Sequence, residues 1–239
     1  MEEDQTKELV IEDFKFEISY EYNLRFKIVI VGDHKVGKTS LIKKAKGELK
    51  SFDEYNPTEG IDQSYFSAKI KDQIINIRMW DINGGKEFKE PTSILLGNTH
   101  LMILVYDITN KESFEDIDYW LELKNKCEEM NNIILVGNKS DMEDKRQVSE
   151  EQVKQKYGSN KNITKFFECS ALNNHNVETI FKEALKLVYL DYCKNGIGNL
   201  PPYDINLADN NTSFNETSEE KSEDESKCNF WNCLCPCWK

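Results

Sequence analysis

The sequence predicts an α/β fold in three layers, with a mostly parallel six-stranded sheet, one antiparallel edge strand and about five helices. Three observations lead to this fold class. Continuously apolar runs such as 101–106 and 133–136 are typical of strands buried on both faces of a parallel sheet. Segments with a helical apolar period separate these runs. A loop with two glycines joins an early strand to the first helix.

The elements follow one another in a regular order. Residues 1–23 form an acidic N-terminal arm, whose later part alternates apolar with polar residues and leads into the first strand. Two alternating stretches around a Lys-Asp-Gln turn predict a hairpin. We expect strands at 25–31, 61–70, 74–80, 101–106 and 133–136 and in the apolar run before Glu168, and helices at 38–47, 111–129, 150–157 and 177–192.

Composition divides the chain and excludes some classes of function. Residues 24–194 carry the α/β pattern, whereas residues 195–239 are rich in polar and acidic residues and are expected to be a disordered tail. The net charge of −12 argues against a general nucleic-acid surface. No apolar run is long enough to cross a bilayer, and the acidic start does not resemble a signal peptide, so we expect a cytoplasmic protein with reduced thiols.

The loop at residues 32–39 reads G-x-x-x-x-G-K-T between a strand and a helix, the context in which this motif binds phosphate. Backbone N–H groups of such a loop and the start of the next helix converge on the anion. The alternative is a glycine turn with a chance lysine. The expected phosphate-binding residues of the loop are Lys35, Val36, Gly37, Lys38, Thr39 and Ser40, with Lys38 on the terminal phosphates and the Thr39 hydroxyl on Mg²⁺.

Two further stretches indicate guanine. Asn138, Lys139 and Asp141 follow a buried strand, and the Asp141 carboxylate can accept both the ring N–H and the exocyclic amine of guanine, a pair of donors that adenine lacks. Ser170, Ala171 and Leu172 follow another apolar run and would offer backbone N–H groups to the guanine oxygen. Taken singly, each stretch could be an ordinary turn, so the prediction depends on their occurring together.

Three residues are expected to complete the phosphate and Mg²⁺ site. Asp81 follows the second strand of the hairpin and would hold Mg²⁺ through water. Gly84 can bring its N–H against a γ-phosphate because it has no side chain. The Thr58 hydroxyl, in a polar loop, would be the second protein ligand of Mg²⁺ while a γ-phosphate orders that loop.

In order and spacing these motifs resemble a small GTPase of the Ras superfamily, over residues 24–194. The stretches 106–114 and 120–121 resemble Rab signatures, whereas 53–58 looks more like the Ras effector loop than the Rab one. This resemblance implies a Rab-like switch in vesicle and membrane traffic that uses GTP, GDP and Mg²⁺. It also implies a monomer that binds effectors through residues 52–66 and 81–96, an exchange factor and an activating protein.

The resemblance breaks down at residues that bear on hydrolysis. The family has a water-orienting Gln where this chain has Gly85, and small residues where it has His34 and Lys35 near the γ-phosphate. No catalytic residue is therefore assigned, and slow turnover is expected. A partner could supply a glutamine, or His34 or Lys35 could place the water; alternatively, His34 is an exposed loop residue without a catalytic role.

The cysteines fall into two groups. Cys127, Cys169 and Cys193 are scattered through the body and are expected to be small apolar fillers. Cys228, Cys233, Cys235 and Cys237 crowd the end, where Pro236 occupies the fourth position from the terminus and so excludes a C-a-a-X signal. Lipidation at Cys235 and Cys237 resembles a Rab-type double site and would anchor the protein to the cytosolic face of an endomembrane or the plasma membrane. S-palmitoylation and a small zinc site are the alternatives.

Three functional hypotheses remain open from the sequence. The first is a Rab-like GTPase that cycles slowly between GTP and GDP. The second is a hydrolysis-deficient, GTP-bound scaffold or signalling adaptor of the wider Ras superfamily, which Gly85 and His34 favour. The third is an ATP-dependent phosphotransferase, which would need ATP to compete with GTP despite Asp141.

Overall fold

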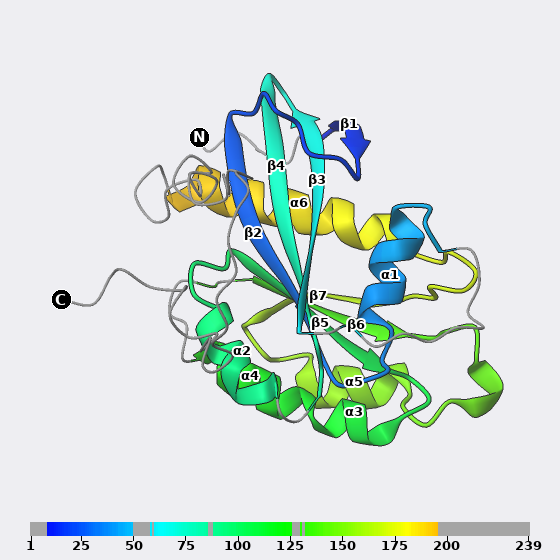
Figure 1. The fold of residues 1–239 in the computed structure, drawn as a ribbon. Coiled ribbons are helices and arrows are strands. Elements are labelled where there is room, and N and C mark those ends of the chain that lie inside the picture. The colour runs from blue at the N-terminus through cyan, green and yellow to red at the C-terminus, as the bar shows by residue number, and fades with distance from the viewer. Residues whose placement is uncertain are drawn as a thin grey trace, which may run out of the picture. The chain divides into compact units, whose positions relative to one another are not determined.

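A computed structural model describes residues 9–49, 58, 60–85, 88–125, 130 and 132–195, all within the unit Met1–Tyr203. Its elements alternate between strands and helices (Figure 1). They are β1 (Ile11–Lys15), β2 (Leu24–Val31), α1 (Lys38–Ala45), β3 (Ile61–Ile70), β4 (Gln73–Ile82), α2 (Lys89–Leu95), β5 (Leu101–Asp107), α3 (Lys111–Glu115), α4 (Ile117–Asn125), β6 (Asn132–Asn138), the 3-10 helix η2 (Glu143–Lys145), α5 (Glu150–Tyr157), β7 (Ile163–Glu168) and α6 (Val177–Asn195).

The sheet contains seven strands in the order β1-β3-β4-β2-β5-β6-β7. β4, β2, β5, β6 and β7 are parallel to one another, and β3 is antiparallel to both of its neighbours. The α/β class with a mostly parallel sheet is confirmed, but the expected number of six strands is too low. The additional strand is β1, which lies in the N-terminal arm and replaces β3 as the edge.

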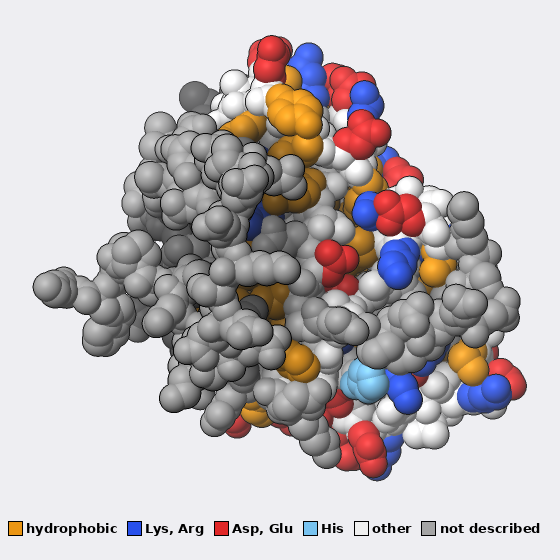
Figure 2. Space-filling view, viewed as in Figure 1, with side chains coloured by type: hydrophobic (Ala, Val, Ile, Leu, Met, Phe, Trp, Pro, Cys, Tyr) orange, Lys and Arg blue, Asp and Glu red, His pale blue; other side chains and the backbone are white. Residues whose placement is uncertain are grey.

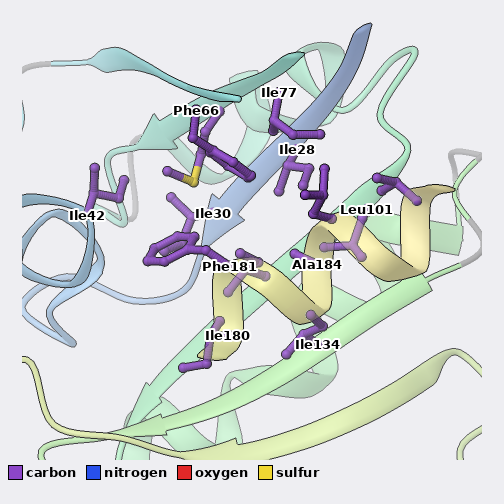
Figure 3. Close-up of a cluster of buried hydrophobic side chains, with 14 of the residues drawn as sticks. Ile28, Ile30, Ile42, Phe66, Ile77, Leu101, Ile134, Ile180, Phe181 and Ala184 are labelled. Carbon is purple, nitrogen blue, oxygen red and sulfur yellow. The ribbon is translucent and has the colours of Figure 1, made fainter. Parts of the chain in front are cut away.

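The alternation of side chains along the central strands places one hydrophobic cluster on each face of the sheet. In β2, Ile28 and Ile30 face a cluster that includes residues of α1 and α6, whereas Val29 and Val31 face a cluster under α3, α4 and α5. All eight residues of β2 and all seven of β5 are buried. Figure 3 shows the first cluster, with Phe181 and Ala184 of α6 beside the strand residues Phe66 and Ile28.

Most predicted helices are present, with changes at their ends. α5 spans the predicted 150–157, and a capping box between Ser149 and Gln152 fixes its start. The predicted helix 111–129 is divided into α3 and α4 by a turn at Asp116. The interruption is a single residue, so the apolar period of the sequence continues across it. Residues 126–129 lie outside the described part. α2 has no counterpart among the predicted segments. No helix of the described residues is long and apolar enough to cross a membrane.

Two of the scattered cysteines have different surroundings. Cys169 is buried in the core, as expected of a small apolar filler, and its burial raises the pKa of its thiol. Cys193 is exposed on α6, so its prediction as a filler is wrong. Cys193 lies one turn after the buried Tyr189 on the same side of α6, but in the last turns of the helix, where residues 190–194 are exposed or half-buried. Cys127 lies outside the described residues.

Candidate functional site

The loop between β2 and α1 leaves the start of the helix without a side-chain cap. Its N-cap residue, Gly37, has a left-handed conformation (φ 96°), and the first turn carries no acidic side chain. The first N–H groups of α1 therefore have no carboxylate or hydroxyl of the cap as an acceptor. An anion suits this position, because these N–H groups and the helix dipole both favour negative charge.

Lys38 is buried at the mouth of this loop. Its ammonium group donates to the carbonyl oxygens of Gly32 and Asp33, both at 2.9 Å. Burial lowers the pKa of Lys38 to about 8, and the carboxylates of Asp81 and Asp33 oppose that shift. An ammonium group has three donors, so one remains for a phosphate oxygen beside the loop.

Three side-chain oxygens meet next to Lys38. The Thr39 hydroxyl donates to Asp81 Oδ2 at 2.5 Å and lies 2.7 Å from the Thr58 hydroxyl oxygen. Asp81 Oδ1 is buried and has no hydrogen-bond partner. Burial raises the pKa of this carboxyl, while its hydrogen bond from Thr39 and the charge of Lys38 act in the opposite direction.

These residues fit the expected Mg²⁺. A hard divalent cation prefers oxygen ligands, and the buried, unpartnered oxygen of Asp81 is the kind of atom that a cation or its bound water satisfies. Thr39 and Thr58 would hold the ion directly and Asp81 through water, and the ion would neutralise the phosphate charge. Within the described residues, no group of three or more His, Cys, Asp or Glu side chains is arranged so that it could hold a metal ion.

Gly84 packs directly against the phosphate loop. A Cβ atom added to it would lie 2.2 Å from the carbonyl oxygen of Gly32, so any larger residue would push the two segments apart. Gly85 follows, and its N–H donates to Asn83 Oδ1 at 2.8 Å. The only group that Gly85 itself can present to a water is its backbone, because glycine has no side chain.

Asn83 is a connecting residue that the sequence reasoning missed. Its Nδ2 donates to the Thr58 carbonyl at 2.7 Å, its backbone N–H donates to the Gly60 carbonyl at 2.9 Å, and its Oδ1 accepts the Gly85 N–H. One side chain thus ties the Thr58 loop to the segment after β4. An amide directly after a strand whose second-last residue is a candidate metal ligand is the signal that points to this role.

Asn138 joins three loops at the end of the sheet. The side chain is buried, and its Nδ2 donates to the Val36 carbonyl of the phosphate loop at 2.9 Å. Its Oδ1 accepts the Ala171 N–H at 3.3 Å. A Cβ at Gly37 would lie 2.2 Å from Asn138 Nδ2, which explains the glycine at that position. Asn138 therefore braces the phosphate loop against the Ser170 segment.

Asp141 and Ser170 face each other across the predicted guanine-binding part. The Ser170 hydroxyl donates to Asp141 Oδ1 at 2.5 Å and accepts the N–H groups of Leu172 and Asn173 at 3.1 and 3.2 Å. Asp141 is half-buried. The structure thus brings the Asn138–Asp141 loop and the Ser170–Leu172 loop together, although 29 positions separate Asp141 from Ser170.

Arg146 is a second residue that the sequence reasoning missed. Its guanidinium donates to both carboxylate oxygens of Glu143 and to both of Glu168, all at 2.7 Å. These bonds raise the pKa of Arg146, with Glu168 as the largest cause, and lower that of Glu143. Because Glu168 lies two residues before Ser170, Arg146 fixes the start of the Ser170 segment against the chain that follows Asp141.

His34 and Lys35 lie on the exposed side of the phosphate loop. They line an open pocket of about 520 Å³ together with Lys139 and residues of the loop after β5. Lys35 has a positive φ of 63°, and Lys139 forms an ion pair of 2.5 Å with Asp107 Oδ2. These two of the three residues that depart from the family pattern therefore meet solvent beside the loop rather than the core.

Several expected residues lie outside the described part of the chain. They include residues 52–57 and 59 of the expected effector region 52–66, residues 86 and 87 of the region 81–96, and the tail from residue 196 on, with Cys235 and Cys237. The described portions of both regions adjoin the site, because Thr58, Asp81 and Gly84 belong to them.

Comparison with known proteins identifies the kind of protein that carries these motifs. The family model described as Ras family matches residues 27–190. The Ras-related protein Rab-11B of Dictyostelium discoideum is 32% identical over 194 residues, covering 81% of this chain and 86% of that protein. The Ras-related protein Rab11B of Nicotiana tabacum is 34% identical over 179 residues, covering 74% and 81%. The GTP-binding protein ypt1 of Schizosaccharomyces pombe is 35% identical over 162 residues, covering 67% and 78%.

Proposed function

Because the chain belongs to the Ras family, as a divergent Rab-like small GTPase, we propose that it is a GTP/GDP switch in vesicle and membrane traffic with slow GTP hydrolysis. Guanine-nucleotide binding follows from the family. The proposal adds that Mg²⁺ is held by Thr39, Thr58 and Asp81, and that the guanine base is read by Asp141. One similar protein is named as GTP-binding, and others carry the Rab name.

The observation that carries the proposal is the bridge at Asn138. Its side chain connects the phosphate loop through Val36 with the segment at Ala171, while Asp141 and Ser170 meet beside it. A triphosphate on the start of α1 and a base at Asp141 would therefore be held by one braced unit. This arrangement supports a nucleotide ligand whose base offers two adjacent N–H donors to a carboxylate.

Base recognition can be tested with the variant Asp141→Asn. We expect its affinity for GTP to fall by about a hundredfold, because one of the two hydrogen bonds from guanine would face an NH₂ donor instead of an acceptor. Asp144→Asn, an exposed carboxylate in η2, is the matched control and should bind as the wild type does. Competition binding with GTP and ATP measures both, and equal competition by ATP in the wild type would overturn the assignment of Asp141.

Slow hydrolysis is proposed from Gly85. Its backbone is fixed by Asn83, and it offers no side chain to orient a water. Single-turnover hydrolysis of γ-labelled GTP should be slow in the wild type and rise about tenfold or more in Gly85→Gln, since positioning a water is worth at least this much in related chemistry. Equal rates in the two proteins would contradict the proposal.

A hydrolysis-deficient scaffold is the second candidate, and the exposed pair His34 and Lys35 favours it together with Gly85. A scaffold would carry GTP almost exclusively when isolated from cells, whereas a slow switch would carry a mixture that shifts towards GDP on incubation. Chromatography of the bound nucleotide separates the two candidates.

The remaining parts of the proposal concern partners and location. We propose a monomer with residues 1–23 as an arm, 24–194 as the GTPase domain and 195–239 as a tail. Effectors would bind through residues 52–66 and 81–96, with an exchange factor and an activating protein setting the nucleotide state.

On the face in Figure 2, Lys and Arg side chains are interspersed with Asp and Glu, a mixture that does not favour nucleic acid.

Membrane attachment is proposed at Cys235 and Cys237, on the cytosolic face of an endomembrane or the plasma membrane. Two lipid chains give stable anchoring where one is marginal. Mass spectrometry of the C-terminal peptide from cells should find lipid on these two cysteines, and unmodified cysteines throughout the peptide would refute the anchor.

A further inference from the structure

Part of the N-terminal arm packs across aromatic residues of the core. In this subsection, "the arm" means residues 9–20. Phe14 and Phe16 lie 5.5 Å from Phe66 of β3, measured between ring centroids, and Phe16 lies 5.2 Å from Phe181 of α6. Phe66 and Phe181 in turn contact each other at 6.1 Å. We call Phe66 and Phe181 the aromatic seam. Aromatic residues two positions apart in the arm therefore reach one seam formed by a strand and a helix distant from them in sequence.

The arm also pairs with the outer edge of β3. In the register, Ile11 lies opposite Ile70, Glu12 opposite Lys69 and Lys15 opposite Ser67 (Figure 1). The Glu12 and Lys69 side chains carry opposite charges, and the Lys182 ammonium lies 5.6 Å from the centre of the Phe14 ring. Backbone pairing, aromatic contact and cations beside an acidic strand thus act together at this edge.

Burial is distributed unequally between the arm and the surface beneath it. No residue of the segment 9–20 is buried, and Val10 and Tyr20 are 63% and 91% exposed. Phe66 and Phe181 are 0% and 1% exposed. The pairing is interrupted between Glu12 and Lys15, where Asp13 has a positive φ of 49°. The arm therefore covers core residues without being part of the core, which is the property of a segment that opens locally.

We propose that the outer edge of β3 and the aromatic seam form a binding site for an extended acidic segment with aromatic residues two positions apart, which the arm occupies within its own chain. Strand addition supplies the affinity of such a site, and pockets for alternate side chains supply its specificity. A partner with this pattern displaces the arm and takes its place on β3. This site is separate from the nucleotide site and does not depend on hydrolysis.

The arm competes from a short tether. After Tyr20 the chain is held to the start of β4, because Asn23 exchanges two hydrogen bonds with Ile74: its N–H donates at 2.8 Å, and its Oδ1 accepts at 2.7 Å. A released arm therefore stays close to β3, at a high effective concentration. A free peptide with the arm sequence should consequently bind wild-type protein poorly and an arm-weakened variant well.

The test uses the full chain and a labelled peptide of residues 9–20. In Phe14→Ser/Phe16→Ser, the arm keeps its tether but loses both aromatic side chains that contact the seam, and we expect this variant to bind the peptide at least about tenfold more tightly than the wild type. A peptide with the same two serines should not bind. Tyr20→Ser, which changes an exposed ring, is the control and should behave as the wild type. A folded double variant that binds no peptide overturns the proposal.

A second experiment avoids the risk that the double variant misfolds. A protease site inserted directly after Tyr20 allows the arm to be cut once the chain has folded. We expect the cut arm to remain bound and then to exchange with the labelled peptide, while amides of β3 at Ser67 and Lys69 become less protected during the exchange. A cut arm that never exchanges with added peptide shows a permanent part of the fold and overturns the proposal.

Discussion

Two buried lysines, one within β2 and one at the start of α1, each donate to two backbone carbonyls but have different surroundings. Lys38, at the carboxyl end of β2, donates to the carbonyls of Gly32 and Asp33. Lys27 donates to the carbonyls of Leu95 and Gly97, just before β5 begins, at 2.6 and 2.9 Å. Both side chains are almost fully buried. Hydrogen bonding to two backbone carbonyls therefore does not separate the lysine of the candidate site from the other one.

The neighbours make the distinction. Lys38 lies beside the carboxylates of Asp81 and Asp33, next to the oxygens of Thr39 and Thr58 and the uncapped start of α1. The ammonium of Lys27 instead lies 4.2 Å from the centre of the Trp80 ring. One lysine thus faces a site that an anion and a cation can complete, and the other is enclosed by carbonyls and an aromatic face. We therefore expect replacement of Lys38 to weaken nucleotide binding and replacement of Lys27 to lower the free energy of unfolding.

Replacing Lys38 should have the largest effect on function. We expect Lys38→Met to weaken GTP and GDP binding by at least about a hundredfold, because a charge-assisted hydrogen bond to phosphate is removed. Lys43→Met, on the exposed side of α1, serves as the control. Calorimetry measures both affinities. An unchanged affinity in Lys38→Met would show that Lys38 does not bind the nucleotide.

Replacing Lys27 should affect stability instead. Lys27→Met leaves the carbonyls of Leu95 and Gly97 without this donor, and we expect the free energy of unfolding to fall by about 3 kcal/mol. Nucleotide affinity of the folded variant should not change. Chemical denaturation and calorimetry on the same preparation measure the two quantities. A variant with normal stability and weakened nucleotide binding would reverse the roles assigned here.

His100 extends the comparison to pH. Its Nδ1 accepts a hydrogen bond from the backbone N–H of Lys27 at 3.0 Å, and the ring packs edge-on against Phe26. Burial is the main cause that lowers the pKa of His100 to about 4, and the charge of Lys27 adds to it. The unfolded chain protonates His100 below pH 6.5, whereas the folded chain keeps the ring neutral down to about pH 4. The stability of the folded state is therefore unaffected above pH 6.5 and declines as the pH falls from 6.5 towards 4.

The expected loss is on the order of 3 kcal/mol at pH 4, from the difference between the two pKa values. His100→Asn retains an acceptor for the Lys27 N–H but does not titrate in this range. Its free energy of unfolding should therefore fall less steeply between pH 6.5 and 4 than that of the wild type. Parallel curves for the two proteins would show that His100 does not contribute to acid sensitivity.

Arg146 should give the smallest effect, because it acts on the guanine-binding part through Glu168. Arg146→Met should weaken GTP binding about tenfold by loosening the segment before Ser170. Arg146→Lys should restore only part of the affinity, since an ammonium group cannot form the two-pronged contact. Lys145→Met, at the exposed neighbouring position, is the control. Full affinity in Arg146→Met would limit the ion pairs to a role in stability.

The nucleotide loops were predictable because their chemistry is local in sequence. The spacing of Gly37, Lys38 and Thr39 between a strand and a helix indicates phosphate without knowledge of any distant contact. Asn83 and Arg146 were not predictable in the same way. Their roles depend on carbonyls and carboxylates up to 25 positions away. A single polar residue in a loop gives no sequence signal of such distant partners.

β1 shows the same limit for the fold. Its five residues, Ile-Glu-Asp-Phe-Lys, lack a regular alternation, and only the register with β3 makes them a strand. The order of strands and helices and the candidate phosphate-binding and guanine-binding residues could be predicted from the sequence, because periodicity and short motifs depend on near neighbours. Only the tertiary structure showed which of two buried lysines lies in the candidate site, how Asn138 joins the loops, and where the arm lies. Those outcomes depend on contacts between distant segments, which form only when the chain has folded.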